Sequence, residues 1–141
     1  MQDRLIGTWR LVSVVNEDAG TGETSDLFGP DPKGYISYGA DGRMMVVQVR
    51  SDRPHPVGDI ASPQEAEALF RSMLSYAGRY TIDGDEVTHH IDIAWNESWS
   101  GTRQTRTFRL DGDRLQLTLA ASPNPFDGRM GTRRIVWEKV R

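Results

Sequence analysis

The 141-residue chain contains no cysteine. It can therefore form no disulfide, use no thiolate nucleophile and hold no cysteine-ligated zinc or iron–sulfur cluster. Long apolar segments are missing too: no run approaches the roughly 20 residues that a helix needs to span a bilayer. The N-terminus also lacks the basic and apolar regions of a signal peptide. These absences predict a cytoplasmic protein without membrane insertion, folded as a single domain over residues 1–141.

Positive charge is not in excess, because 17 lysines and arginines stand against 20 aspartates and glutamates, for a net charge of −3. Nucleic-acid-binding proteins concentrate positive charge on one face, so we expect no nucleic-acid partner. The chain also lacks the Gly-rich nucleotide loops, the Gly-x-Ser-x-Gly elbow and the His-Glu-x-x-His metal motif. We therefore expect no cofactor, and any catalysis would depend on His, Asp, Glu, Tyr, Ser or Arg side chains.

Alternating polar and apolar residues fill most of the chain, interrupted by Asp-Gly turns at 39–42, 83–85 and 111–113. Such turns between alternating segments are typical of β-hairpins. The predicted strands are 5–15, 34–40, 43–50, 79–83, 85–95, 102–111, 113–120 and 132–140. About eight antiparallel strands can close into a barrel that holds one small ligand. The expected fold is all-β, a closed antiparallel barrel.

One segment departs from the strand pattern. Ser62-Pro63-Gln64-Glu65 has the sequence of an N-cap, a first-turn proline and a capping-box glutamate, and apolar residues follow at helical spacing. We predict one amphipathic helix over residues 62–77 that plugs or flanks one end of the barrel. The preceding segment, residues 50–56, is polar and rich in proline, which makes it a candidate lid.

The first and last strands carry aromatic and basic residues suited to closing a barrel. Leu5-Ile6-Gly7-Thr8-Trp9 opens the first strand, and Arg133-Arg134-Ile135-Val136-Trp137 lies in the last. An arginine can stack on an indole face while it donates hydrogen bonds to backbone carbonyls. We therefore predict that Trp9 packs at the closed end against Arg134, in preference to Arg133.

Several segments together resemble the bacterial and fungal lipocalin-like domain family. They are Leu5–Ser13, Gly29–Ile36, Tyr38–Met44, Gly78–Ile91 and Arg114–Thr118. The similarity runs in order through nearly the whole chain and includes the family's helix between the third and fourth strands. It implies a lipocalin-like, calycin-type barrel that binds a small apolar or amphiphilic molecule. No shared reaction comes with the resemblance, although some members resemble accessory proteins encoded beside natural-product pathways.

A histidine pair lies on the strand predicted at 85–95. Because side chains alternate across a strand, His89 faces the barrel interior and His90 faces solvent. The residues that share the inner face with His89 are Val87, Ile91, Ile93 and Trp95. His89 then contacts a ligand, acts as a general acid or base, or is a core histidine satisfied by a neighbouring polar group. Adjacent strand residues diverge and no third ligand has suitable spacing, so we expect no metal site.

A charged residue is expected inside the barrel on the next strand. Phe108 marks the inner face, so Gln104 and Arg106 point inward as well. An inward Arg106 is suited to hold a carboxylate, enolate or phenolate, and Gln104 to bind a carbonyl. The alternatives are an internal salt bridge with an acid such as Asp92 or Glu97, or a bulge that turns this face outward.

The remaining candidate ligand contacts are aromatic, thioether and amide side chains. Two tyrosines lie on opposite faces of one strand, so only one lines the cavity, and the pattern leaves open which. A methionine and a glutamine belong to the following strand, and two tryptophans bracket a polar turn at the barrel mouth or simply pack at a strand end. These residues are Tyr35, Tyr38, Met45, Gln48, Trp95 and Trp99.

The leading hypothesis is binding of a small hydrophobic or amphiphilic ligand inside the barrel, oriented by His89, Arg106, Gln104 and one tyrosine. The alternative is a cofactor-independent isomerase or cyclase that acts on a polyketide-like or other apolar metabolite in a biosynthetic pathway. In that case His89 and Arg106 are the catalytic residues, for proton transfer and enolate stabilisation. A third class is a structural or interaction module whose barrel is filled by side chains. The sequence leaves the oligomeric state open.

Overall fold

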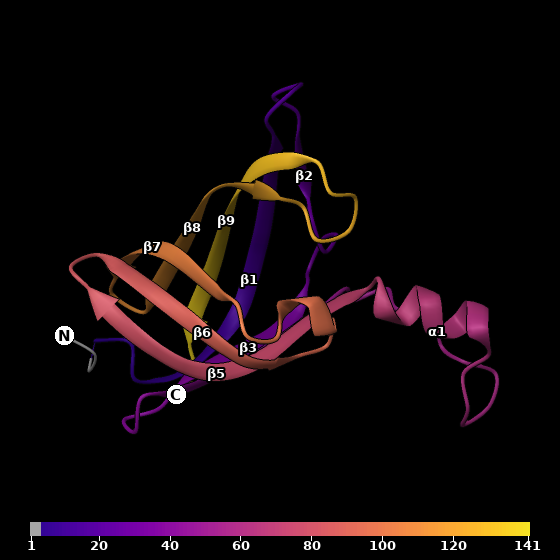
Figure 1. Ribbon diagram of the computed structural model, residues 1–141, viewed down its shortest axis with the longest axis horizontal. Helices are drawn as coiled ribbons and strands as arrows, with labels where there is room; N and C mark the ends of the chain where they lie inside the picture. The colour runs from indigo at the N-terminus through magenta and orange to yellow at the C-terminus, as the bar shows by residue number, and fades with distance from the viewer. Residues whose placement is uncertain (1–3) are drawn as a thin grey trace.

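The computed structural model describes residues 4–141 and is a β-barrel with one protruding helix (Figure 1). Neighbouring strands are antiparallel, and the barrel closes because β1 pairs with both β3 and β9. The short β2 pairs with β1 outside the closed ring of eight. The strands are β1 (Gly7–Asp18), β2 (Thr24–Asp26), β3 (Lys33–Tyr38), β4 (Arg43–Val49), β5 (Met73–Asp83), β6 (Glu86–Ala94), β7 (Arg103–Asp111), β8 (Arg114–Pro123) and β9 (Met130–Lys139). The predicted all-β barrel is confirmed.

The core lies inside the ring, where alternate side chains of each strand point inward. Trp137, Val87 and Leu115 have no exposed surface, and Tyr38 and Ile36 are 1% exposed. These side chains come from four different strands, so the closed ring itself creates the apolar interior. Burial of this surface is the main force that stabilises the barrel.

Trp9 closes one end of the barrel. Its indole Nε1 donates a hydrogen bond to the carbonyl oxygen of Leu5 at 3.0 Å, and the side chain is 3% exposed. Lys139 Nζ lies 4.6 Å from the centroid of an indole ring and donates to the carbonyl oxygen of Ile6 at 2.7 Å. A cation thus covers the indole and satisfies a backbone carbonyl, as the sequence predicted for this end.

The identity of that cation was predicted wrongly. Arg134 is exposed, and the structure places Lys139 over the indole instead. The reason is strand register, because Trp9 lies directly opposite Lys139 in the β1–β9 pair. Arg133 is buried, but it pairs with Asn16 farther along β1.

β-Bulges change which side chains face inward on three strands. The register shifts between Leu11 and Ser13 on β1, beside Asp92 on β6, and between Leu119 and Ser122 on β8. An extra residue reverses the alternation beyond it. Ile93, predicted to face the interior, is therefore 67% exposed.

The protruding helix, α1 (Pro63–Phe70), is shorter than predicted. Its capping box forms as expected: Glu65 N donates to Ser62 Oγ at 3.2 Å, and Ser62 N donates to the Glu65 carboxylate at 2.8 Å. The second half of the predicted helix instead begins β5, where Leu74 and Tyr76 alternate inward. Every α1 residue stays at least partly exposed, and Figure 1 shows the helix standing away from the barrel wall. Over residues 4–141, no helix is long and apolar enough to cross a bilayer.

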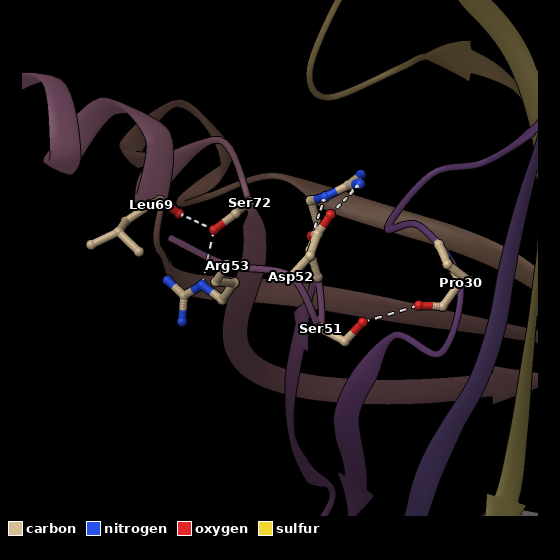
Figure 2. A network of polar contacts seen from close by, with 7 residues as sticks. Pro30, Ser51, Asp52, Arg53, Leu69 and Ser72 are labelled. Carbon is tan, nitrogen blue, oxygen red and sulfur yellow. Dashed lines mark hydrogen bonds and ion pairs between the residues drawn. The ribbon is translucent and has the colours of Figure 1, made fainter. Parts of the chain in front are cut away.

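The segment that leads from β4 to α1 is held in place by hydrogen bonds near its start (Figure 2). Ser51 Oγ donates to the carbonyl oxygen of Pro30 at 3.1 Å, and Arg53 Nε donates to Ser72 Oγ at 2.9 Å. Ser72 Oγ in turn donates to the carbonyl oxygen of Leu69 at 2.6 Å, at the end of α1. The first residues of the predicted lid are therefore held beside the end of the barrel. Its action as a lid stays a prediction.

Candidate functional site

A cavity of about 200 Å³ lies inside the barrel, at the end opposite Trp9. The helical turn η2 (Glu97–Trp99) and the loops before β3 and after β8 contribute to it, along with six strands. Its apolar lining residues are Val14, Leu27, Phe28, Leu74, Trp99, Leu119, Pro123, Pro125 and Ile135. Its polar lining residues are Gln48, Gln104, Arg106, Ser122 and Arg133. The cavity thus combines a mostly apolar wall with a few converging polar groups.

Arg106 places a positive charge in the wall of this cavity. Its side chain projects inward from β7 and is 4% exposed. Its Nη1 is fully buried and has no hydrogen-bond partner among residues 4–141. The inward orientation predicted from the alternation of β7 is confirmed. Asp92, one of the acids considered as its partner, forms an ion pair with Arg43 instead.

Arg133 brings a second guanidinium group to the same cavity. Its Nη1 donates to Asn16 Oδ1 at 3.0 Å, and its Nη2 donates to the carbonyl oxygen of Pro123 at 3.0 Å and to the side chain of Ser122. Burial lowers the pKa of Arg133, and the positive charge of Arg106 lowers it further, while Asp127 opposes both. Neutral oxygen atoms therefore hold this buried guanidinium in place.

Sequence reasoning considered Arg133 only as a partner of Trp9 and missed its place at the cavity. A signal was present, because Arg133, Ile135 and Trp137 share one face of β9 and Trp137 is fully buried. The alternation that placed Arg106 inward would have placed Arg133 inward as well.

Two predicted amides and one predicted tryptophan are found at the cavity. Gln48 is 5% exposed on β4, Gln104 is half-buried on β7, and Trp99 lies in η2. All three belong to the cavity lining. Their contact with a ligand stays a prediction, but the positions are those from which contact is possible.

His89 lies in the core beside the cavity lining. It has no exposed surface, and both ring nitrogens contact tyrosine hydroxyls: Nε2 lies 2.6 Å from Tyr38 OH, and Nδ1 lies 2.6 Å from Tyr76 OH. Burial, followed by the positive charge of Arg106, lowers the pKa of His89 well below its usual value. The neutral ring then donates to one tyrosine and accepts from the other. This arrangement is the core histidine considered above, and contact with a ligand would require one tyrosine to give up its bond.

The protein should lose stability as the pH falls below the usual pKa of histidine, because His89 is held neutral. In the unfolded chain the pKa of His89 returns to about 6.5. Below that pH the unfolded chain takes up a proton that the folded protein excludes, so the free energy of unfolding falls by up to about 1.4 kcal/mol per pH unit. Above that range the contribution is fully present. Urea unfolding between about pH 7.5 and about pH 5.5 measures it.

A His89→Leu variant provides the control for this pH dependence. It keeps the partly exposed His90, so the difference between the two pH slopes isolates His89. We expect a shallower slope in the variant, and equal slopes would contradict the assignment.

Three predicted contacts line an outer groove instead of the internal cavity. An open groove of about 520 Å³ crosses the outer face of β3, β4, β5 and β6, and it includes Tyr35, Met45 and Trp95. Tyr35 is 49% exposed and Met45 is 66% exposed, whereas Tyr38 is the buried tyrosine. Strand alternation explains the first two placements, and the bulge beside Asp92 reverses the face before Trp95. These three residues are therefore not positioned to line the internal cavity.

The closed ring of eight strands with an internal cavity is a lipocalin-like architecture. The family model described as a lipocalin-like domain matches residues 6–140, and the chain belongs to this family. A lipocalin-like protein from Bacteroides uniformis has a similar crystal structure, with 14% sequence identity, 96% of this chain and 98% of that chain covered, and a TM-score of 0.51.

A second solved structure is that of an uncharacterized protein from Bacteroides eggerthii, with 13% identity, 96% and 99% coverage and a TM-score of 0.46. The comparison with curated proteins found no match. The similarity to solved structures concerns the fold, so the nature of the ligand has to be argued from the side chains at the cavity.

Proposed function

We propose that the protein binds a small amphiphilic molecule inside its barrel. The observation that carries the proposal is the cavity itself, where apolar walls meet the inward side chains of Gln48, Gln104, Arg106 and Arg133. Buried polar atoms in folded proteins almost always have a hydrogen-bond partner. Arg106 Nη1 has none among residues 4–141, although it lies in a side chain that borders the cavity. A polar group of a ligand would satisfy it.

The cavity volume limits the size of the ligand. Pockets that enclose drug-sized molecules have volumes of about 300–1,000 Å³, whereas this one has about 200 Å³. The apolar side chains of Val14, Leu119 and Ile135 favour a ligand that also has an apolar part, because its burial contributes about 25 cal/mol per Å².

The geometry supports binding over the isomerase or cyclase alternative. Proton transfer needs a general acid or base within hydrogen-bond distance of the substrate. Within the described part of the chain, the cavity lining includes no His, Asp, Glu, Lys or Tyr. His89 is the general acid or base that the sequence raised, but it is absent from the cavity lining, and both of its ring nitrogens already contact tyrosines.

Filling the cavity should abolish binding while the barrel stays folded. Native mass spectrometry of freshly purified protein identifies any ligand that co-purifies. Ligand-observed NMR with a panel of small acids, amides and alcohols then measures binding to the wild type and to Leu119→Trp. The new indole would occupy the cavity, so we expect at least about a tenfold loss of affinity.

The outer groove offers a matched control. Met45→Trp adds the same indole on the exposed face of β4, where we expect no effect on binding. Circular dichroism and thermal melting check that both variants fold. Loss of binding in Met45→Trp together with full binding in Leu119→Trp would place the ligand in the outer groove and refute the proposal. So would a wild-type protein that binds none of the probes and carries no ligand.

A further inference from the structure

We propose that the ligand of the barrel is a small organic anion whose oxyanion group binds at the cavity wall formed by the guanidinium groups of Arg106 and Arg133. This inference rests on the proposed function and adds the charge of the ligand to it. Its basis is the juxtaposition of two buried arginines at one cavity, with no acidic side chain among the buried residues described between positions 4 and 141.

The charged side chains buried among residues 4–141 are both positive, with no acidic side chain beside them. The buried polar and charged side chains are Asn16, Gln48, Ser72, His89, Arg106, Asn124 and Arg133. Buried charges in folded proteins are usually paired or bound to an ion of opposite sign, because an isolated charge in a low-dielectric interior is strongly unfavourable. An anion in the cavity would therefore be attracted by both guanidinium groups at once.

The core residues next to Arg106 cannot supply a compensating negative charge near neutral pH. Burial raises the pKa of the hydroxyl groups of Tyr38 and Tyr76, so both tyrosines stay protonated. His89, which lies between them, cannot supply a negative charge either, because an imidazole is either neutral or positively charged. The positive charge of Arg106 is consequently left for a molecule in the cavity.

The two arginines are suited to different parts of the task. Arg133 is fixed by Asn16 and by oxygen atoms of Ser122 and Pro123, none of which is charged. Asp127 lowers the electrostatic cost of this site, but no ion pair joins it to Arg133 among the described residues. Arg106 keeps an unpartnered Nη1, so it has a donor to offer to an oxyanion. We therefore expect Arg106 to contact the anion directly and Arg133 to contribute mainly its positive field.

The cavity also restricts the apolar part of the anion. Leu74, Leu119 and Ile135 line the wall around the arginines, so a short apolar body would be buried next to the charged group. Small aromatic or aliphatic acids fit this description. A carboxylate and a phosphate share the required chemistry, since each presents two negatively charged oxygen atoms that can accept paired hydrogen bonds from one guanidinium group.

The decisive experiment compares ligands that differ in charge and little in shape. Phenylacetate and phenylacetamide are titrated into the wild-type protein by calorimetry near neutral pH, with phenyl phosphate as a third probe. We expect the carboxylate to bind at least about tenfold more tightly than the amide, and added salt to weaken the carboxylate alone. Comparison of the carboxylate with the phosphate identifies the preferred oxyanion.

Variants of β7 locate the effect. Arg106→Gln should remove the preference for the carboxylate and leave the affinity for the amide nearly unchanged. Arg109→Gln removes the same charge from the exposed face of the same strand and should leave both affinities unchanged. Without ligand, Arg106→Gln should melt no lower than the wild type, because no partner of its buried Nη1 is lost.

The outcomes separate this inference from the proposed function. Equal affinities of the wild type for the carboxylate and the amide would overturn the anion proposal while ligand binding stands. Binding of none of the three probes, together with a neutral co-purified ligand in native mass spectrometry, would overturn the anion proposal in the same way. A lower melting temperature of ligand-free Arg106→Gln would show that the fold itself compensates this charge, and would also overturn it.

Discussion

Replacing Trp9 with alanine is expected to lower the free energy of unfolding by about 3 to 5 kcal/mol, the usual cost of truncating a large buried aromatic side chain. The indole is 3% exposed and plugs the closed end of the barrel. Its removal leaves a cavity, and it also deprives the Leu5 carbonyl of its donor and Lys139 of the ring that it covers. Urea or guanidinium unfolding followed by circular dichroism measures the loss.

Tyr35→Ala is a suitable control, because it removes another aromatic ring from the opposite, outer face of the neighbouring strand. Tyr35 is 49% exposed, so we expect a loss of less than about 1 kcal/mol. A Lys139→Met variant tests the cation separately and should cost much less than Trp9→Ala, since contacts between a cation and an aromatic ring contribute about 0.5 to 2 kcal/mol. An unchanged denaturation midpoint in Trp9→Ala would contradict the role of Trp9 as a plug.

The closure of the barrel could be predicted because it depends on repeated local signals. The hairpin turns around Asp41, Gly84 and Gly112 each join strands whose apolar residues alternate. Arg106 was placed correctly for the same reason, since β7 runs without a register shift against both of its neighbours. Where a strand is regular, its sequence indicates which side chains face inward.

The sequence could not predict which side chains face inward at the end of β6, because the bulge in this strand depends on the neighbouring strand. Gly78 on β5 lies opposite the bulge, where a Cβ atom would come within 1.8 Å of the His90 carbonyl oxygen. Glycine at this position is required by the close approach of the two backbones. The single sequence does not reveal that Gly78 and His90 meet, so the outward turn of Ile93 and Trp95 was missed.

The end of α1 was mispredicted because two periodicities overlap there. Leu69, Met73 and Ala77 fit a helical repeat, whereas Leu74, Tyr76 and Tyr80 fit the alternation of a strand. Short apolar segments often fit both patterns. Pairing with β4 and β6 favours the strand, and this pairing is a property of the assembled barrel.

Removal of the imidazole of His89 is expected to lower the free energy of unfolding by about 2 to 6 kcal/mol, because two buried hydroxyls then lose a partner at a cost of about 1 to 3 kcal/mol each. In His89→Leu, the hydroxyls of Tyr38 and Tyr76 would face an apolar side chain of similar size. The wild-type ring serves both at once, since its two nitrogens lie on opposite sides of the ring. Chemical denaturation at about pH 7.5 measures the cost, at a pH where wild-type His89 is neutral in both the folded and unfolded states.

A triple variant distinguishes the loss of hydrogen bonds from the loss of packing. When Tyr38→Phe and Tyr76→Phe are added to His89→Leu, no hydroxyl is left without a partner, and apolar replacement of all members of a network is often nearly neutral. We therefore expect the triple variant to recover most of the stability that His89→Leu loses. A triple variant less stable than His89→Leu would show that the tyrosine hydroxyls keep other partners when the imidazole is gone. In that case the wild-type His89 could turn one nitrogen toward a ligand at little cost in stability, as the ligand-contact hypothesis for His89 requires.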